Sequence, residues 1–281
     1  MTGVQTCALP ISLCQCLAAN YIEGIAGILN GTTNFILTMM IEKGMSFDEA
    51  LKIAQEKGYA EKDPTADVEG HDACRKVCIL ASLAFGKHVY PNQVETEGIT
   101  NITLEDVSYI ENAGGVIKLL GQIKYINDNE IAAFVSPAVV YNGSQLASVK
   151  DVFNAILVRG DAVGDVCFYG PGAGKLPTAS AVVADIIDCA KHSERKKIFG
   201  WGAGDEDYVV DYKERIEMPF YVRAKATPAE INAKFSDVKF LSRKGQPSDE
   251  VAFITDIMTE NKLNKKLDGI NVINTIKVTN Y

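Results

Sequence analysis

The residues best able to do chemistry lie in one stretch of the chain, from Gly58 to Phe85. Asp72 and Lys76 are four residues apart, so on a helix they are neighbours and can form an ion pair. The same helical stripe becomes apolar one turn later, which directs it towards the protein interior. A surface Asp–Lys pair is common and means little. A partly buried lysine held by an aspartate could instead donate a proton near neutral pH, and the pattern alone leaves both interpretations open.

The loop before this helix is strongly acidic. Glu61, Asp63, Asp67 and Glu69 fall within nine residues. They could form a solvated acidic loop, which the turn-forming Pro64 would suit. They could equally form a receptor for a cationic group, for instance a substrate ammonium, and composition does not choose between the two.

Two glycine-containing turns are further candidates. The segment GPGAGKLPT, residues 170–178, follows an expected strand and precedes an expected helix, a geometry that presents backbone N–H groups to an anion. It is neither a Walker A loop nor a G-x-G-x-x-G turn, because Lys175 is followed by Leu176 and itself occupies a glycine position. A tight structural turn explains it as well. NGTTN, residues 30–34, predicts a polar turn whose threonines could cap a helix or contact a ligand.

Strands and helices alternate irregularly around these segments. The sequence predicts a helix over 35–44 that ends at Gly44, a second with an N-cap at Ser46 and a capping box to Glu49, and a third from His71 to Phe85. The expected strands are 25–29, 115–126, 130–141, 151–158 and 165–170, and the second and third of them form a hairpin through 127–129. The last helix expected in this part is 181–191. This pattern predicts an α+β fold, a mixed sheet with helices on one face.

The pattern of expected helices and strands changes near Asp207. The remaining segments follow the order β-α-β-β-α-β, which predicts a small ferredoxin-like domain. We therefore expect one domain over 13–210 and a second over 211–281. Residues 1–12, MTGVQTCALPIS, have no amphipathic period and no cationic start of a secretory signal. We expect them to be a non-native junction and exclude them from fold reasoning.

Composition narrows the class of protein. With 281 residues, 47% hydrophobic and 23% charged, the chain is an ordinary globular one. A net charge of -8 without a basic patch argues against nucleic acid as a partner, and no apolar run reaches the roughly 20 residues of a membrane helix. Seven cysteines without a CxxC pair and three scattered histidines argue against a zinc site. We expect no metal site of this kind and a reduced, cytoplasmic protein.

The stretch from Ala54 to Lys76 resembles the signature of the homoserine dehydrogenase family. The matching positions are Gly58, Asp63, Pro64, Asp67, Gly70, Asp72 and Lys76. GILNGTTNFIL, LASVKDVFNAILVRGDAVGD and YGPGAGKLPTASAVVADIID also resemble family segments, and the resemblance covers about residues 16 to 200. The C-terminal module resembles an ACT domain.

The resemblance implies a reversible, NAD(P)-dependent reduction of L-aspartate 4-semialdehyde to L-homoserine, in threonine, methionine and isoleucine synthesis. Lys76 would be the general acid, and Asp72 would hold that lysine and contact the substrate. Glu61 would bind the substrate's ammonium group. The other implied substrate-binding residues are Gly31, Thr32, Tyr59 and Asp67. Those expected to approach the nicotinamide end of the cofactor, NADP or NAD, are Gly58, Gly172 and Gly174.

The sequence also departs from the family pattern. The family's dinucleotide-binding domain, with a second catalytic lysine, is not found in this sequence. The backbone carbonyls for a monovalent cation should lie just before residue 13, in the segment expected to be non-native, so we expect that cation site to be lost. We therefore expect weak NAD(P)H binding and little turnover by this chain alone. A non-catalytic amino-acid-binding regulatory remnant is the alternative function. A bifunctional aspartate kinase–dehydrogenase is disfavoured by the C-terminal place of the ACT-like module.

The ACT-like module departs too. Its first loop, ATPAEINAKF, lacks the usual glycine turn, so effector binding and a plain packing or dimerisation role both stay open. By family analogy we expect a homodimer or homotetramer.

Overall fold

The computed structural model describes residues 17–194 and 200–281. The segment expected to be non-native, residues 1–12, and the position expected for cation-binding carbonyls lie outside the described residues.

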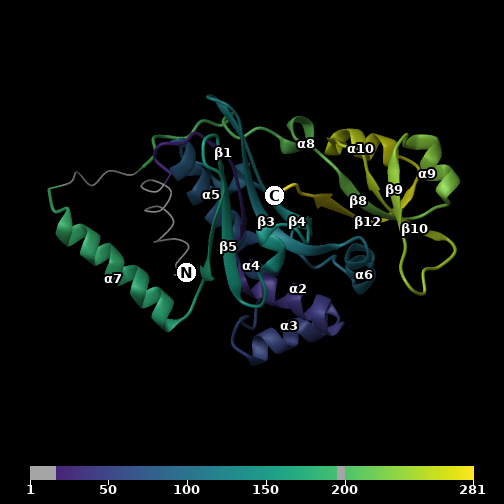
Figure 1. The fold of residues 1–281 in the computed structure, drawn as a ribbon, viewed down its shortest axis with the longest axis horizontal. Helices are drawn as coiled ribbons and strands as arrows, with labels where there is room; N and C mark the ends of the chain where they lie inside the picture. Colours follow the sequence, from purple (N-terminus) through teal and green to yellow (C-terminus); the bar gives the residue numbers. More distant parts are fainter. Residues whose placement is uncertain (1–16, 195–199) are drawn as a thin grey trace.

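A single sheet runs through the described part of the chain (Figure 1). It has ten strands there, with β6-β5-β1-β3-β4-β12-β8-β10-β9 in spatial order and β2 beside β4. The strands are β1 Ile22–Ile28, β2 Glu95–Thr96, β3 Gly115–Asn127, β4 Glu130–Tyr141, β5 Phe153–Gly160, β6 Gly164–Pro171, β8 Phe220–Lys225, β9 Val238–Leu241, β10 Glu250–Thr255 and β12 Asn271–Val278. A separate pair consists of β7 Glu217–Met218 and β11 Met258–Thr259.

The longest pairing is the β3–β4 hairpin, as the sequence predicts. Its register runs from Gly115 opposite Tyr141 to Asn127 opposite Glu130. The Asn127 side chain closes the turn, because its Oδ1 accepts from the backbone N–H of Asn129 at 2.9 Å.

Nine helices are described. They are α2 Gly31–Lys43, α3 Phe47–Glu56, α4 Thr65–Val68, α5 His71–Phe85, α6 Leu104–Asn112, α7 Lys175–Lys191, α8 Tyr212–Arg215, α9 Pro228–Lys234 and α10 Glu260–Leu267, with short 3-10 turns η1 Pro91–Gln93 and η2 Gln145–Ser148. The capping box of α3 and both ends of α5 agree with the sequence prediction.

Two helices begin earlier than the sequence predicts. The expected turn over residues 30–34 is wrong, because the Asn30 side chain caps the backbone N–H of Thr33 and α2 starts at Gly31. Helix α7 starts at Lys175 rather than 181, after Gly174 with φ 117°. Pro177 fits its first turn, where a missing N–H costs no helical hydrogen bond.

The two faces of the sheet are covered differently. Helices α2, α5 and α6 pack on one face, against alternating residues of β3 and β4 such as Ile117 and Ala133. On the opposite face, η2 and the C-terminal Tyr281 cover the first part of the sheet. Helices α8, α9 and α10 cover the later strands on that same face, together with Phe134 of β4.

The chain after residue 210 adds four of its six strands to the same sheet. These four follow the order β12-β8-β10-β9 with antiparallel neighbours, the arrangement of a β-α-β-β-α-β unit. Strand β12 joins β4 in parallel. Across this junction the fully buried Asp106 accepts hydrogen bonds from Tyr221 at 3.0 Å and Asn274 at 2.9 Å.

Helix α7 is the least buried of the long helices. It projects away from the sheet in Figure 1, and of its residues only Ala181 is buried. Its apolar side chains Leu176, Val183 and Ile186 are 78%, 51% and 60% exposed. None of the helices in the described ranges is long and apolar enough to cross a membrane.

Candidate active site

Lys76 is held by two oxygen atoms, one just after the end of strand β1 and one on its own helix, α5. Its Nζ donates to Asp72 Oδ2 and to the carbonyl oxygen of Leu29, both at 2.7 Å. The side chains of Lys76 and Asp72 are only 14% and 16% exposed. The ammonium has three N–H donors, so one remains for a ligand after these two bonds. The inward direction of the stripe, expected from the sequence, is therefore observed.

Asn30 connects this pair to the acidic loop. Its Nδ2 donates to Asp72 Oδ2 at 2.9 Å and to Asp67 Oδ1 at 2.7 Å. Its Oδ1 accepts from the backbone N–H of Thr33 at the start of α2. One amide thus caps a helix and orients two carboxylates. The sequence analysis missed Asn30, although an Asn at a helix N-cap beside a chemically active segment was the signal available.

Asp67 is the carboxylate whose protonation is most affected by this arrangement. Burial raises its pKa above the ordinary value, and the nearby Asp72 carboxylate raises it further. The hydrogen bond from Asn30 opposes both effects. Asp63 behaves in the opposite way, because the hydroxyl and backbone N–H of Thr65 lower the pKa of its exposed carboxyl.

The loop after α3 is fixed to the first turn of α2. Thr32 Oγ1 donates to the carbonyl oxygen of Tyr59 at 2.7 Å. The ring of Tyr59 packs edge-on against Phe35, with centroids 5.1 Å apart. Gly58, at φ 73°, permits the turn that places this loop. Glu61 follows in this loop; it is exposed and lines the cavity.

The glycine loop before α7 forms another wall. A Cβ at Gly172 would lie 2.0 Å from Asn154 Nδ2, so the two residues are in direct contact. A Cβ at Gly31 would lie 2.8 Å from the carbonyl oxygen of Val152. Side chains at these two glycines would therefore displace the walls themselves.

All ten residues expected from the sequence line a single cavity of about 990 Å³. They are Gly31, Thr32, Gly58, Tyr59, Glu61, Asp67, Asp72, Lys76, Gly172 and Gly174. The cavity also contains residues that the sequence analysis did not select, among them Asn30, Asn154, Arg75 and Lys175. Asn154 follows two apolar residues in an expected strand, a pattern that gives no sign of a ligand contact.

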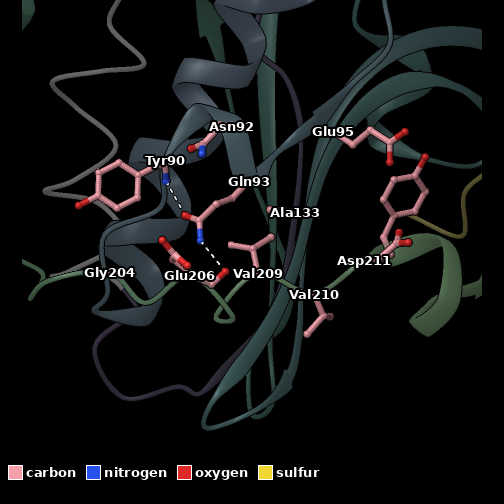
Figure 2. Close-up of a pocket in the computed structure, with 11 residues that line it drawn as sticks. Tyr90, Asn92, Gln93, Glu95, Ala133, Gly204, Glu206, Val209, Val210 and Asp211 are labelled. Atoms are coloured by element: carbon pink, nitrogen blue, oxygen red, sulfur yellow. Dashed lines mark hydrogen bonds between the residues drawn. The ribbon is translucent and has the colours of Figure 1, made fainter.

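A second cavity, of about 900 Å³, lies between η1, β2 and the segment that leads into α8 (Figure 2). Three carboxylates line it, on Glu95, Glu206 and Asp211. Gln93 crosses one side, accepting from Tyr90 N and donating to the carbonyl oxygens of Asp205 and Glu206. None of the described residues that line it has a basic side chain. Nowhere in the described part of the chain do three His, Cys, Asp or Glu side chains group as metal ligands would.

The lysine–aspartate pair, the acidic loop and the glycine loop all lie within the part of the chain that one family model matches. The family model of homoserine dehydrogenase matches residues 11–187. The chain belongs to the homoserine dehydrogenase family. The homoserine dehydrogenase of Synechocystis sp. is 49% identical over 177 residues, which are 62% of this chain and 41% of that protein. The chain thus spans well under half the length of this relative.

Solved structures extend the likeness beyond the matched sequence. A homoserine dehydrogenase from Thiobacillus denitrificans has a TM-score of 0.85 at 35% identity, over 99% of this chain and 68% of that one. A hyperthermophilic archaeal homoserine dehydrogenase mutant, solved in complex with NADPH, has a TM-score of 0.56 at 27% identity. That comparison covers 70% of this chain and 56% of the archaeal one.

Proposed function

We propose that this chain carries the substrate-binding and proton-transfer half of a homoserine dehydrogenase. The reaction is the reversible, NAD(P)-dependent reduction of L-aspartate 4-semialdehyde to L-homoserine, a step of threonine, methionine and isoleucine synthesis. The observation that carries the proposal is Lys76, held by Asp72 and the Leu29 carbonyl in the cavity that the acidic loop also lines.

The acidic loop accounts for an amino-acid substrate. Glu61, which lines the cavity, binds the ammonium group, and Asp67 adds negative charge to the same cavity. Thr32 and Tyr59, joined by their hydrogen bond, line the pocket beside Gly31. A site built for an ammonium rejects aldehydes without one, because its carboxylates would then lose a partner.

Lys76 moves the proton. During reduction, its third N–H donates to the carbonyl oxygen as negative charge develops there, and the proton ends on the new hydroxyl. In the reverse direction the neutral amine takes that proton back. Asp72 and the Leu29 carbonyl fix Nζ in position, so the lysine spends little conformational entropy during the reaction.

A nicotinamide cofactor fits the part of the cavity wall formed by Asn154 and the glycine loop. Asn154 Oδ1 is buried there without a hydrogen-bond partner among the described residues, and because Gly172 has no Cβ its backbone contacts Asn154 directly. Gly58, Gly172 and Gly174 would approach the nicotinamide end. When bound, NADPH or NADH supplies the hydride, and the NADPH complex of the archaeal relative supports this cofactor class.

The nucleotide-binding part of the complete enzyme would dock on α7. Leu176, Val182, Val183, Ile186 and Ile187 are between 47% and 78% exposed, and an apolar helix of this kind is normally buried. The Synechocystis relative extends well beyond the matched region, which provides chain for such a domain. Because α7 begins in the glycine loop, a domain seated on it would border the cavity.

We also propose a domain division and an oligomeric state for this chain. Residues 13–210 would form the substrate-binding and dimerisation domain, and 211–281 an ACT-like domain. In place of the ACT glycine turn, Thr227 and Glu230 form a capping box with Pro228 at the first helical position. A packing role or an effector site both fit this module. We propose a cytoplasmic homodimer or homotetramer.

The test joins this chain to the nucleotide-binding domain of a close relative and measures homoserine oxidation with NAD(P)⁺. The joined protein should turn over, whereas the present chain alone should show little activity. Lys76→Ala should lower kcat by about 10²- to 10⁴-fold, the usual contribution of a general acid or base. Lys52→Ala, on the exposed side of α3, is the control. A folded joined protein in which Lys76→Ala retains full kcat contradicts the proposed role.

A further inference from the structure

Asn154 contributes a buried amide to the cavity wall, and the proposed function gives that amide no specific ligand contact. It lies in β5 and lines the cavity, although its side chain is only 4% exposed. Its Oδ1 is buried and has no hydrogen-bond partner among the described residues. A buried acceptor without a donor costs free energy, so such a group calls for an explanation.

Two glycines flank this amide. A Cβ at Gly172 would lie 2.0 Å from Asn154 Nδ2, and one at Gly31 would lie 3.5 Å from Oδ1. The amide is therefore held between backbone segments rather than between side chains. A flat group can approach such a surface, whereas any side chain at Gly172 would push Asn154 away.

The charged and the uncharged parts of the cavity wall suit different kinds of ligand group. The carboxylates that attract an ammonium are Glu61 in the loop after α3, Asp67 in α4 and Asp72 in α5. Asn154 comes from β5 and contacts uncharged glycines. A neutral N–H donor suits it better than a cation. An amide offers an acceptor and a donor together, which a primary carboxamide complements with its own N–H₂ and C=O.

We propose that Asn154 binds the carboxamide of the nicotinamide ring and so fixes the rotation of that ring in the cavity of Lys76. The carboxamide N–H donates to Oδ1, and its oxygen accepts from Nδ2. The inference rests on the proposed function. It adds a residue that positions the cofactor from the substrate-domain side.

The test uses the full chain labelled with ¹⁵N. It is titrated with 1-methylnicotinamide, and the side-chain amide signal of Asn154, assigned by its loss in Asn154→Leu, is followed by NMR. The matched ligand is 3-acetyl-1-methylpyridinium, which keeps the carbonyl but lacks the N–H₂. The carboxamide should shift the Asn154 signal and bind about fivefold more tightly, the effect of one net hydrogen bond.

The variants decide whether Asn154 is responsible. Asn154→Leu should bind the two ligands equally, and Asn154→Ala serves if leucine disturbs the fold. Asn142→Ala, an exposed asparagine after β4, should keep the fivefold preference. Equal binding of both ligands by the wild type, an unchanged preference in Asn154→Leu and Asn154→Ala, or no binding of 1-methylnicotinamide would each overturn the proposal.

A parallel titration with L-homoserine separates this inference from the proposed function. Homoserine binding without any carboxamide preference overturns the role of Asn154 and leaves the proposed function standing. A carboxamide preference that depends on Asn154, with no homoserine binding, supports the amide contact and contradicts the proposed function.

Discussion

The Nζ of Lys76 lies 2.7 Å from the carbonyl oxygen of Leu29, 47 residues earlier in the chain. Leu29 follows directly after β1, and Lys76 lies in the second turn of α5. The bond therefore ties the helix that carries the proposed proton donor to the sheet. Because Asn30, the next residue, orients Asp67 and Asp72, a change at this strand end would disturb the whole charged cluster.

Asp67→Asn should make the chain more stable at neutral pH. Burial and Asp72 raise the pKa of Asp67, so the folded state holds its proton more readily than the unfolded state. The charged carboxylate therefore destabilises the fold above that pKa, and the amide does not. The expected gain is about 1 kcal/mol, of the size often found when functional strain is removed.

Urea unfolding of Asp67→Asn at several pH values measures this gain. The gain should disappear as pH falls through the pKa of Asp67, where the wild-type carboxyl is also neutral. Asp63→Asn is the control in the same loop, and since the pKa of Asp63 is lowered, it should not stabilise. A loss of stability in Asp67→Asn at neutral pH would show that the carboxylate is not under strain.

Lys118→Met should change how stability depends on pH. Lys118 is buried and donates to Asn34 Oδ1 and to the Val149 carbonyl. Burial, with Lys150 nearby, lowers its pKa from 10.5 to about 8, against smaller opposing effects of Glu42 and Asp151. Between pH 8 and 10.5 the unfolded state thus binds more protons at this lysine than the folded state, so wild-type stability rises relative to Lys118→Met.

Unfolding free energies of both proteins across pH 7 to about 11 test this expectation. Lys52→Met, at an exposed lysine, should show no such rise and serves as the control. A wild-type advantage that stays flat, or falls, across the interval would mean that Lys118 keeps its proton in the folded state.

The sequence predicted the direction of the Asp72–Lys76 pair, but it did not predict the residues that surround and hold the site. The Asp72–Lys76 spacing and the apolar residues that follow were sufficient to place the lysine inward, because a helix fixes which side chains share a face. Asn154 and Lys118 depend on partners elsewhere in the chain, Gly172 and Asn34 respectively. Local patterns carry no information about such contacts, so these residues could not be selected in advance.

The fold shows the same difference between features set by local signals and features set by long-range contacts. The hairpin and the capped helices follow from local signals, and the β-α-β-β-α-β order was readable from its segments. The joining of β12 to β4, which makes one sheet of both parts, depends on long-range pairing. The early start of α2 was missed because an Asn–Gly pair signals a turn as strongly as it signals a helix N-cap.

Replacing exposed apolar residues of α7 by charged ones should reduce association of the chain with itself. The exposed Ile186 and Ile187 belong to the surface proposed to meet the nucleotide-binding part. Ile186→Lys with Ile187→Lys should therefore lower the fraction of aggregated or higher-order species in sedimentation velocity, without a large change in unfolding midpoint. Asp185→Asn, which changes charge on the same helix but removes no apolar surface, should have little effect. Equal association of all three proteins would argue that α7 is not a docking surface.

The most direct test of the account is calorimetric titration of this chain with L-homoserine and with 4-hydroxybutanoate, which lacks only the ammonium group. Homoserine should bind, 4-hydroxybutanoate should bind at least about tenfold more weakly, and Glu61→Gln should remove most of this difference, as expected for a hydrogen bond to a charged group. Glu56→Gln, at the end of α3 and outside the cavity lining, should behave as wild type. Equal affinity for the two ligands, or a preference that survives in Glu61→Gln, would contradict the claim that this cavity is a homoserine site.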